Sequence, residues 1–513
     1  MRTNQRWRYA LALSAAMALV ACGGGSSKPP DTTPPPAPER PTAMQWQMTS
    51  LAEASVALVP GGGYGLDTPS APTVDWLGFN SGTNLLDAQS ASYSAGSWQV
   101  APTSSMTGLP TGLAYTPFHV SKAGAWTVFR AILGGTLYAR FDGPNGVSSG
   151  FVPVSTVANS IGWAAVDASG VARLYWPDNT GPNTVVTRTG HFTGTTWVDD
   201  GLEPGMSLYA DAVAAGADGQ GWLFYSYIGP YATQDQFVRH VDAVNGLGAE
   251  VRLDDPALGF SVSTRKAAAE SSTAVTTVAR QASVSAVCLA VRRFAAGAWS
   301  GAQCVNQLPT PATVGETYEV AANASGRALV AWRDDTGRLY ASVRRVDGGW
   351  GGARLVAAMP AGEVLSDIYP SVDGSGNSIV VYRTTLIASP SRLRAVVYKE
   401  ATESWGASEL VDATDGSAYP RVSVAFNAQG EPGVLSFART GSGDFEVHVS
   451  TRVDGAWSTA ATPAVFATRP TFPYDITTIQ RLIPFGTRGW AAFWEVSSPV
   501  GGGARRLMMA TYQ

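Results

Sequence analysis

Apolar and polar residues alternate along many short stretches of the chain. In residues 446–453, β-branched side chains occupy one side of the chain, while Glu446 and His448 fall on the other. This period of two is typical of a β-strand, and turn-forming pairs such as Asp347-Gly348 bound the alternating runs. Because no segment sustains the 3.6-residue period of a helix, the pattern predicts an all-β protein of short antiparallel strands.

A tryptophan recurs at steps of about 50 residues, and a fixed period of this length is typical of repeat architectures. It closes an apolar run in most units, and the two slots that lack it fall near Gly146 and Gly246. A second shared element, a glycine shortly before an aromatic residue, lies upstream, as Gly326 lies before Trp332. The closing tryptophans that we assign to this spacing are Trp46, Trp98, Trp197, Trp299, Trp350, Trp405 and Trp457. Each unit is therefore expected to hold about four short strands.

Four antiparallel strands in each of many repeats predict a β-propeller, and we expect one such domain over residues 44–513. Propellers have four to eight blades as a rule, so about eight blades are favoured, with seven or nine also open. The last unit ends at residues 505–513 without a closing tryptophan, while Trp46 begins an orphan strand. We therefore predict that the N-terminal strand completes the last blade. The competing architecture is two stacked smaller domains, but no linker-like stretch after residue 45 supports it.

The N-terminus reads as a targeting segment. Residues 1–21 combine a basic start with an apolar stretch that is too short to span a bilayer. The stretch ends in Leu-Val-Ala-Cys22, which resembles the lipobox of bacterial lipoproteins. The resemblance implies that the Cys22 thiol takes a diacylglycerol and becomes the first residue after cleavage. A plain secretory signal with a chance cysteine is the alternative.

Residues 22–43 are rich in Gly, Ser and Pro, and they are expected to form a disordered tether. Gly23 follows the cysteine, and in lipoproteins an aspartate at this place favours retention at the inner membrane. The resemblance therefore implies a lipid-anchored protein of the outer membrane, facing the periplasm or the cell surface. The chain resembles repeat-containing bacterial lipoproteins without an assigned activity.

Composition and chemical motifs narrow the function further. The net charge of −4 and the low charged fraction of 14% argue against a nucleic-acid partner. The four histidines fall in different units without metal-ligand spacing, so we expect structural histidines, no metal and no cofactor; they are His119, His191, His240 and His448. Phosphate loops and the Ser-x-Asp-x-Gly-x-Thr-Trp boxes of sialidases are absent. An enzyme is therefore the less favoured reading, and a monomer is expected.

Cys288 and Cys304 flank a predicted turn whose midpoint is Ala296. They are therefore expected to face each other across a hairpin, where an oxidising compartment favours a disulfide. A metal or redox role is the alternative, and it would need more ligands.

The loops between second and third strands, together with those between blades, are expected to share the functional face. The first group includes Asp178 in one loop and the pair Asp334 and Asp335 in another. The second group places a tyrosine before the first strand of several units: Tyr115, Tyr209, Tyr318, Tyr369, Tyr419 and Tyr474. These rings either stack on a ligand or pack between blades, and recurrence in every unit favours packing.

These observations favour a lipid-anchored binding or interaction module that recognises a glycan or an envelope protein at its loop face. One alternative is a scaffold in outer-membrane protein assembly. The other is a hydrolase or lyase that acts on glycans.

Overall fold

The structure is a computed structural model, and all of its described residues belong to the second of two units of the chain, residues 45–513. The predicted signal peptide, Cys22 and the tether lie outside the described residues. The structure describes residues 46–50, 56–58, 73–80, 85–94, 97–100, 104–106, 118–123, 126–158, 162–166, 170–181, 184–207, 211–213, 221–228, 234–242, 246–253, 261–271, 273–282, 287–307, 314–386, 389–412, 422–439, 445–466, 481–485, 489–497 and 505–512.

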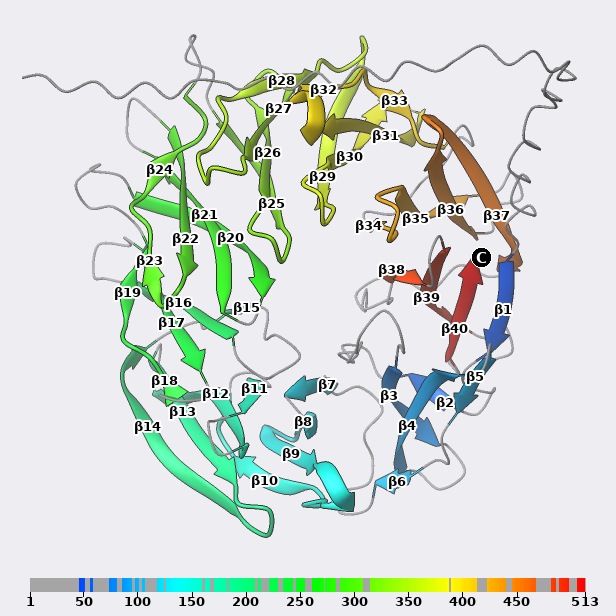
Figure 1. Cartoon of the computed structure of the whole chain (residues 1–513). Helices are drawn as coiled ribbons and strands as arrows, with labels where there is room; N and C mark the ends of the chain where they lie inside the picture. Colours follow the sequence, from blue (N-terminus) through cyan, green and yellow to red (C-terminus); the bar gives the residue numbers. More distant parts are fainter. Residues whose placement is uncertain are drawn as a thin grey trace, which may run out of the picture. The chain divides into compact units, whose positions relative to one another are not determined.

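The described strands form nine sheets of four or five strands, and within each sheet antiparallel neighbours pair in a meander (Figure 1). The expected all-β fold is confirmed, and each sheet resembles a blade of a β-propeller. One sheet combines strands from both ends of the second unit: β1 (Trp46–Ser50), β38 (Arg481–Phe485), β39 (Gly489–Ser497) and β40 (Arg505–Tyr512).

Four sheets precede residue 255. Their strands are β2 (Val56–Leu58), β3 (Thr73–Asn80), β4 (Leu85–Ser94), β5 (Ser97–Val100) and β6 (Ser104–Met106); β7 (Phe118–Ala123), β8 (Trp126–Leu133), β9 (Thr136–Asp142) and β10 (Val152–Ser155); β11 (Trp163–Val166), β12 (Ala172–Gly181), β13 (Thr184–Phe192) and β14 (Trp197–Ser207); and β15 (Asp211–Val213), β16 (Gly221–Ile228), β17 (Gln234–Asp242), β18 (Gly246–Leu247) and β19 (Val251–Arg252). A short 3-10 helix, η1 (Pro144–Gly146), follows β9.

Four more sheets follow. Their strands are β20 (Ser261–Ser271), β21 (Ala274–Ala282), β22 (Val287–Ala295), β23 (Ala298–Trp299) and β24 (Gln303–Cys304); β25 (Val314–Ala322), β26 (Ala328–Asp334), β27 (Leu339–Arg344) and β28 (Arg354–Ala357); β29 (Glu363–Val372), β30 (Ser378–Leu386), β31 (Ser389–Lys399), β32 (Ser404–Trp405) and β33 (Glu409–Leu410); and β34 (Ser423–Phe426), β35 (Pro432–Arg439), β36 (Phe445–Val453) and β37 (Ala456–Phe466). The 3-10 helix η3 (Glu400–Thr402) joins β31 to β32.

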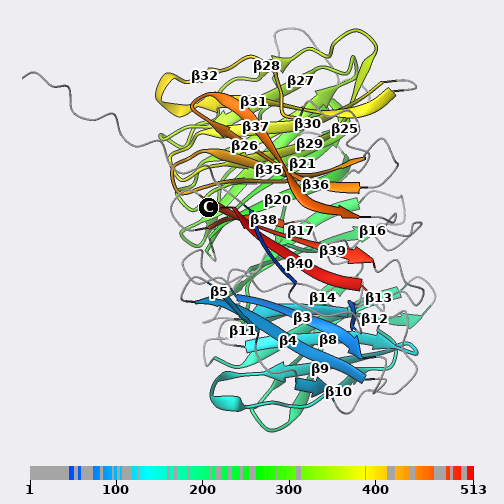
Figure 2. The ribbon, with the colours of Figure 1, turned by 90° about the vertical axis from the view of Figure 1, so that its right-hand side faces the viewer.

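The first and last strands of the second unit pair directly. Strand β1 runs antiparallel to β40, with Trp46 opposite Tyr512 and Ser50 opposite Met508 (Figures 1 and 2). Each sheet also contacts the sheet that follows it in the chain, and β40 contacts β2. The sequence favoured eight blades and left seven or nine open, whereas the described strands form nine sheets.

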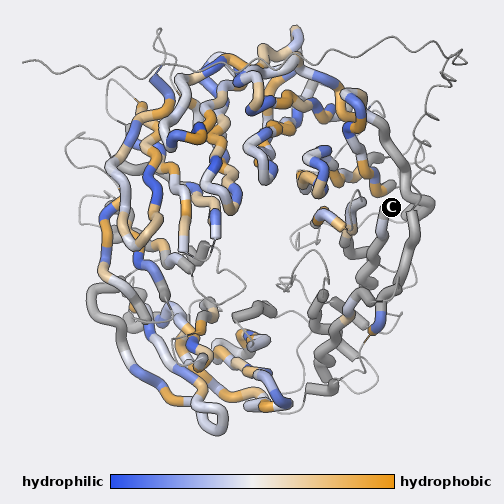
Figure 3. Tube along the Cα trace, viewed as in Figure 1, coloured by the Kyte–Doolittle hydropathy of each residue, from blue (hydrophilic) through white to orange (hydrophobic). Residues whose placement is uncertain are grey.

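The core lies between successive sheets. Along β26, Leu329 and Ala331 belong to a cluster shared with the β29–β33 sheet, whereas Val330 and Trp332 belong to a cluster shared with the β20–β24 sheet. Alternate residues of one strand thus enter two different cores, because a neighbouring sheet covers each face. Hydrophobic and hydrophilic positions follow each other closely along the described strands (Figure 3).

The closing tryptophans connect neighbouring sheets. Trp350 is partly buried and packs against the cluster shared by its own sheet and the preceding one. The same arrangement recurs in each junction for which a core cluster is described, and it involves Trp197, Trp299, Trp350, Trp405 and Trp457. The repeated tryptophan is therefore a packing residue of the junction, which explains its recurrence along the chain.

The recurring glycine also acts at a junction. Gly326 lies in the turn between β25 and β26 with φ +79°, in the left-handed region that favours glycine. A Cβ atom at this position would lie 2.6 Å from Nη2 of Arg293 in the preceding sheet. Gly376, at the same place in the next sheet, has φ +94° and would similarly approach Arg327. The glycine therefore permits both the turn and the close contact between sheets.

We expect the substitution Gly326→Ala to lower the free energy of unfolding by about 1–3 kcal/mol, because alanine is strained at this φ and its Cβ displaces Arg293. Urea unfolding followed by tryptophan fluorescence measures the change. Gly301→Ala is the control, since nothing lies within 4 Å of a Cβ there; its effect should stay within about 0.5 kcal/mol. Equal effects of the two substitutions would contradict the role assigned to Gly326.

Candidate functional site

The Asp334 carboxylate stabilises the turn between β26 and β27 through hydrogen bonds. It is 1% exposed, and it accepts hydrogen bonds from the backbone N–H of Thr336 and Arg338 at 3.0 and 2.8 Å. The Thr336 hydroxyl at 2.8 Å and Nε of Arg338 at 2.8 Å add two more bonds. The sequence predicted that the turn between β26 and β27 offers two carboxylates to a ligand. In the structure the buried carboxylate, Asp334, bonds to the turn itself, whereas Asp335 is exposed.

Burial alone would raise the pKa of Asp334, but its bonds from the Arg338 backbone, Thr336 and the Arg338 guanidinium outweigh burial and lower the pKa. A carboxylate with a lowered pKa contributes stability above its ordinary pKa. That stability is lost as the pH falls through the pKa of the folded state.

Asp178 lies on β12 and is 3% exposed. It accepts a hydrogen bond from the Ser155 hydroxyl at 2.6 Å, and Nε of Arg188 lies 3.6 Å away. Burial raises the pKa of this carboxyl, while Ser155 and Arg188 oppose the rise. Asp178 belongs to a different sheet from Asp334 and Asp335.

Two of the predicted tyrosines are described. Tyr318 is 1% exposed and belongs to the core cluster between the β20–β24 and β25–β28 sheets. Tyr369 is partly buried against the core cluster between the β29–β33 and β34–β37 sheets, and burial raises its pKa. Both rings therefore pack between sheets, which was the alternative to stacking on a ligand. The other four predicted positions lie outside the described residues: Tyr115, Tyr209, Tyr419 and Tyr474.

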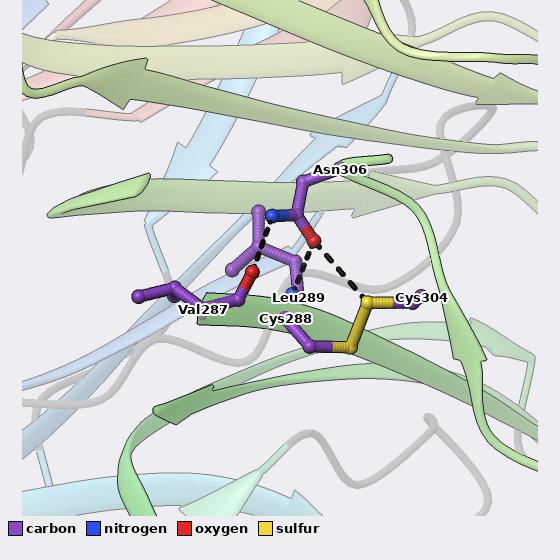
Figure 4. The surroundings of a disulfide bond; sticks show 5 residues. All are labelled: Val287, Cys288, Leu289, Cys304 and Asn306. Atoms are coloured by element: carbon purple, nitrogen blue, oxygen red, sulfur yellow. Dashed lines mark hydrogen bonds between the residues drawn. A yellow bond between two sulfur atoms is a disulfide. The ribbon is translucent and has the colours of Figure 1, made fainter. Parts of the chain in front are cut away.

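Cys288 and Cys304 form a disulfide with a Cα–Cα distance of 5.5 Å (Figure 4). The cysteines are diagonal rather than directly opposite, because Cys304 pairs in register with Ala290. The expected symmetry about Ala296 is therefore wrong: the turn is centred between Ala296 and Gly297, and the chain shifts before β24.

Asn306 fixes the strand beside the disulfide. Its side-chain oxygen accepts from the backbone N–H of Leu289 at 2.7 Å, and its Nδ2 donates to the carbonyl of Val287 at 2.7 Å (Figure 4). The disulfide is thus embedded in a bonded edge of the sheet, which fits a structural role.

Three of the four histidines have partners within the fold, and the side chain of His119 lies outside the described part of the structure. His448 is 1% exposed, and its Nδ1 lies 2.5 Å from the Asp412 carboxylate. His191 contacts Asp200 at 2.9 Å, while His240 packs on Trp222. Within the described residues, no group of three potential ligands is placed to hold a metal ion. No helix in that part of the chain is long and apolar enough to cross a membrane.

An open pocket lies where the β20–β24 and β25–β28 sheets meet. This first pocket has a volume of about 370 Å³, within the usual range for small ligands. Tryptophan and arginine side chains from both sheets line it, together with small residues of the β23 edge. Its lining residues are Val291, Arg292, Arg293, Ala295, Ala298, Trp299, Ser300, Gly301, Gln303, Arg344, Gly348 and Trp350.

A second pocket, of about 420 Å³, lies at the next junction, between the β25–β28 and β29–β33 sheets. It is built from equivalent positions. Each pocket contains the second residue after the closing tryptophan of its earlier sheet, which is Gly301 in the first pocket and Gly352 in the second. Each also contains the strand residue that pairs with the closing tryptophan of its later sheet, which is Arg344 in the first pocket and Tyr398 in the second. Its lining residues are Ala341, Val343, Arg345, Gly351, Gly352, Arg354, Leu355, Tyr398, Glu403 and Trp405.

Charged groups differ between the two pockets. In the first, Arg293 pairs with Glu270 at 2.5 Å, and Arg344 donates to the carbonyls of Gly326 at 2.9 Å and Gly348 at 3.1 Å. Burial and the neighbouring Arg293 lower the pKa of Arg344. In the second, Arg345 forms an exposed 3.1 Å ion pair with Glu403.

Both pockets lie at the opposite strand ends from the face that the sequence favoured. They adjoin the hairpins β22–β23 and β27–β28, whereas the Asp334 turn joins β26 to β27 at the other end. The recurring tryptophans were assigned to the scaffold alone, so sequence reasoning missed the pockets beside them. The sequence does show one sign of the pockets: the residue that pairs with the closing tryptophan changes between units, from Arg344 in one to Tyr398 in the next.

No protein-family profile matches the chain, and no curated protein matches it by sequence. Among solved structures, the chain is similar to the BP39L lectin from Burkholderia pseudomallei, with 16% identity and a TM-score of 0.38 over 81% of this chain and 99% of the lectin. It is similar to the polysaccharide lyase Uly1, with 9% identity and a TM-score of 0.37 over 67% of this chain and 88% of the lyase.

The β-propeller domain of the Trilobed protease from Pyrococcus furiosus has 8% identity and a TM-score of 0.32 over 72% of this chain and 100% of that domain. At these identities and TM-scores, the likenesses carry no argument about what this chain binds or catalyses.

We expect Asp334→Ala to destabilise the protein by about 1–3 kcal/mol at neutral pH, because it removes the charged acceptor of the hydrogen bonds that Thr336 and Arg338 donate within the turn. Thermal unfolding at pH 7 measures the loss. Asp335→Ala is the matched control and should change stability by no more than about 0.5 kcal/mol. The difference between wild type and Asp334→Ala should shrink in acid, and a difference independent of pH would argue against the carboxylate's role.

Proposed function

We propose that residues 45–513 form a nine-bladed β-propeller that β1 closes. The pairing of β1 with β40 supports this, as does the contact of every sheet with its successor. When the last sheet in a succession also contacts the first, every sheet has a neighbour on both faces and no apolar face is left uncovered. Nine blades exceed the usual four to eight.

We propose that this propeller is a glycan-binding protein and that the two pockets are its binding sites. The observation that carries the proposal is the recurrence of one pocket, built from equivalent residues, at successive junctions. Aromatic rings offer an apolar face to the C–H side of a sugar, and guanidinium groups donate to its oxygens. Repeated equivalent sites also suit a polymeric ligand, since several weak contacts add through multivalency.

The lining residues favour binding over hydrolysis. Glycoside hydrolases as a rule need two carboxyl groups that flank the scissile bond. The described residues that line the two pockets include one carboxylate, Glu403, which is paired with Arg345. Binding needs only the aromatic and guanidinium groups that both pockets contain.

We also propose that Cys22 carries a lipid that anchors the propeller to the outer membrane. The lipobox-like end of the apolar stretch supports this proposal, as does the Gly, Ser and Pro-rich segment that follows it. A tethered domain could then reach glycans some distance from the membrane surface.

Blocking the pockets tests the binding proposal. Gly301 and Gly352 line one pocket each, and nothing lies within 4 Å of a Cβ at either position. We expect the double variant Gly301→Trp/Gly352→Trp to fold normally and to lose at least about ten-fold in affinity on a glycan array, a loss worth about 1.4 kcal/mol. Gly374→Trp is the control, because this position is equally open but lines neither pocket.

Two results would refute the binding proposal. One is an array on which the wild-type protein retains no glycan. The other is retention that the double variant and Gly374→Trp share equally.

The anchor is tested separately. We expect Cys22→Ala to abolish incorporation of radiolabelled palmitate and to move the protein from the membrane fraction to the soluble fraction, because the acyl chains supply the membrane affinity. Cys304→Ser is the control and should keep the label. Undiminished labelling of the Cys22 variant would exclude the proposed anchor site.

A further inference from the structure

We infer that the first pocket selects sugars that carry a carboxylate, whereas the second pocket takes neutral sugars. This inference rests on the proposed glycan-binding function and adds a chemical class to each site. It concerns the side chains that differ between two otherwise equivalent cavities.

The first pocket concentrates positive charge. Arg292, Arg293 and Arg344 line it, and none of its described lining residues is acidic. Arg293 comes from β22 and Arg344 from β27 of the next sheet, so these two guanidinium groups reach the cavity from two sides. The guanidinium group of Arg292 donates to the backbone carbonyl of Arg252 in the preceding sheet at 3.3 Å. Converging guanidinium groups match the planar oxygens of a carboxylate, which they can bind through paired hydrogen bonds.

One buried carboxylate offsets only part of this charge. Glu270 has a fully buried side chain and accepts from the Thr276 hydroxyl at 2.6 Å. It pairs with Arg293 and lies 3.5 Å from Nη1 of Arg344. Arg327, whose charge acts on Arg344, pairs with Glu400 at 3.2 Å. The surroundings therefore retain more positive than negative groups.

Mutual repulsion within this cluster favours an anionic ligand. Burial lowers the pKa of Arg344 most, the charges of Arg293 and Arg327 lower it further, and Glu270 opposes them. A carboxylate in the cavity relieves that repulsion, because an opposite charge stabilises the cationic form. The tryptophans of the same cavity, Trp299 and Trp350, supply the apolar wall on which the sugar ring packs.

The second pocket has a different arrangement of charges, since two arginines, Arg345 and Arg354, line it together with one carboxylate, Glu403. Tyr398 stands where the first pocket has Arg344, and Glu403 faces Arg345 across the cavity edge at 3.1 Å. A ligand carboxylate there would meet Glu403, and like charges at close range repel each other. A neutral sugar can instead use the hydroxyl of Tyr398 and the ring of Trp405.

A panel of uronic-acid and sialic-acid oligosaccharides, each paired with its methyl ester, tests the inference by isothermal titration calorimetry on the purified protein. Each pair differs only in the charge. We expect at least one acid to bind at least about ten-fold more tightly than its ester, and this preference to fall with added salt. Gly301→Trp should remove the preferred binding, whereas Gly352→Trp should leave it intact.

The reciprocal exchange Arg344→Tyr and Tyr398→Arg refines the test. Arg344→Tyr should erase the preference for the acid, and Tyr398→Arg with Glu403→Gln should create a second acid-binding site and raise the stoichiometry. If Arg344→Tyr lowers the melting temperature sharply, Gly301→Trp replaces it as the test variant, because it leaves the arginines in place.

The inference is overturned if no acid in the panel binds more tightly than its ester, or if Gly352→Trp rather than Gly301→Trp removes the preference. Failure of the proposed function gives a different result, since neither glycine variant then alters binding of any glycan. Binding of neutral glycans that Gly352→Trp blocks, without any preference for acids, would retain the function and reject only the charge selectivity.

Discussion

The packing of one sheet against the next is the interaction on which the rest of this structure depends. A single four-stranded sheet has two apolar faces, and β26 shows the consequence, since its alternate residues enter two different cores. The closing tryptophan belongs to the same junction, where Trp350 lies over the seam between its own sheet and the preceding one. Full burial of an apolar side chain contributes about 1.5–3 kcal/mol, and each junction buries several of them, so each junction is a substantial part of the fold's stability.

At a junction that is built in this way, the residue beside the closing tryptophan can differ from one unit to the next. The tryptophan and the turn glycine are fixed by packing and by φ, as Trp350 and Gly326 show. The strand residue that pairs with the tryptophan is not so constrained, and it is Arg344 at one junction and Tyr398 at the next. The scaffold can therefore present similar cavities whose chemistry differs from one junction to another, in the way that one fold commonly carries different sites.

The sequence predicted the all-β class and the recurring unit because alternation and the tryptophan period follow directly from strand geometry and junction packing. It could not locate the two pockets. The Asp334 turn looked like an exposed acidic loop, and only the structure shows that Asp334 is 1% exposed and bonded to its own backbone. The same limit applies to the cysteines, because a one-residue shift before β24 moves Cys304 opposite Ala290. Cavities between sheets depend on contacts across units, which local pattern does not reveal.

A crystal structure of the protein soaked with an oligosaccharide that it retains on an array would test the central claim most directly. The account predicts that the sugar lies at a junction between sheets, against the closing tryptophan, in the pocket lined by Trp350 or in the one lined by Trp405. A sugar bound at the turn of Asp334, at the other end of the strands, would contradict it.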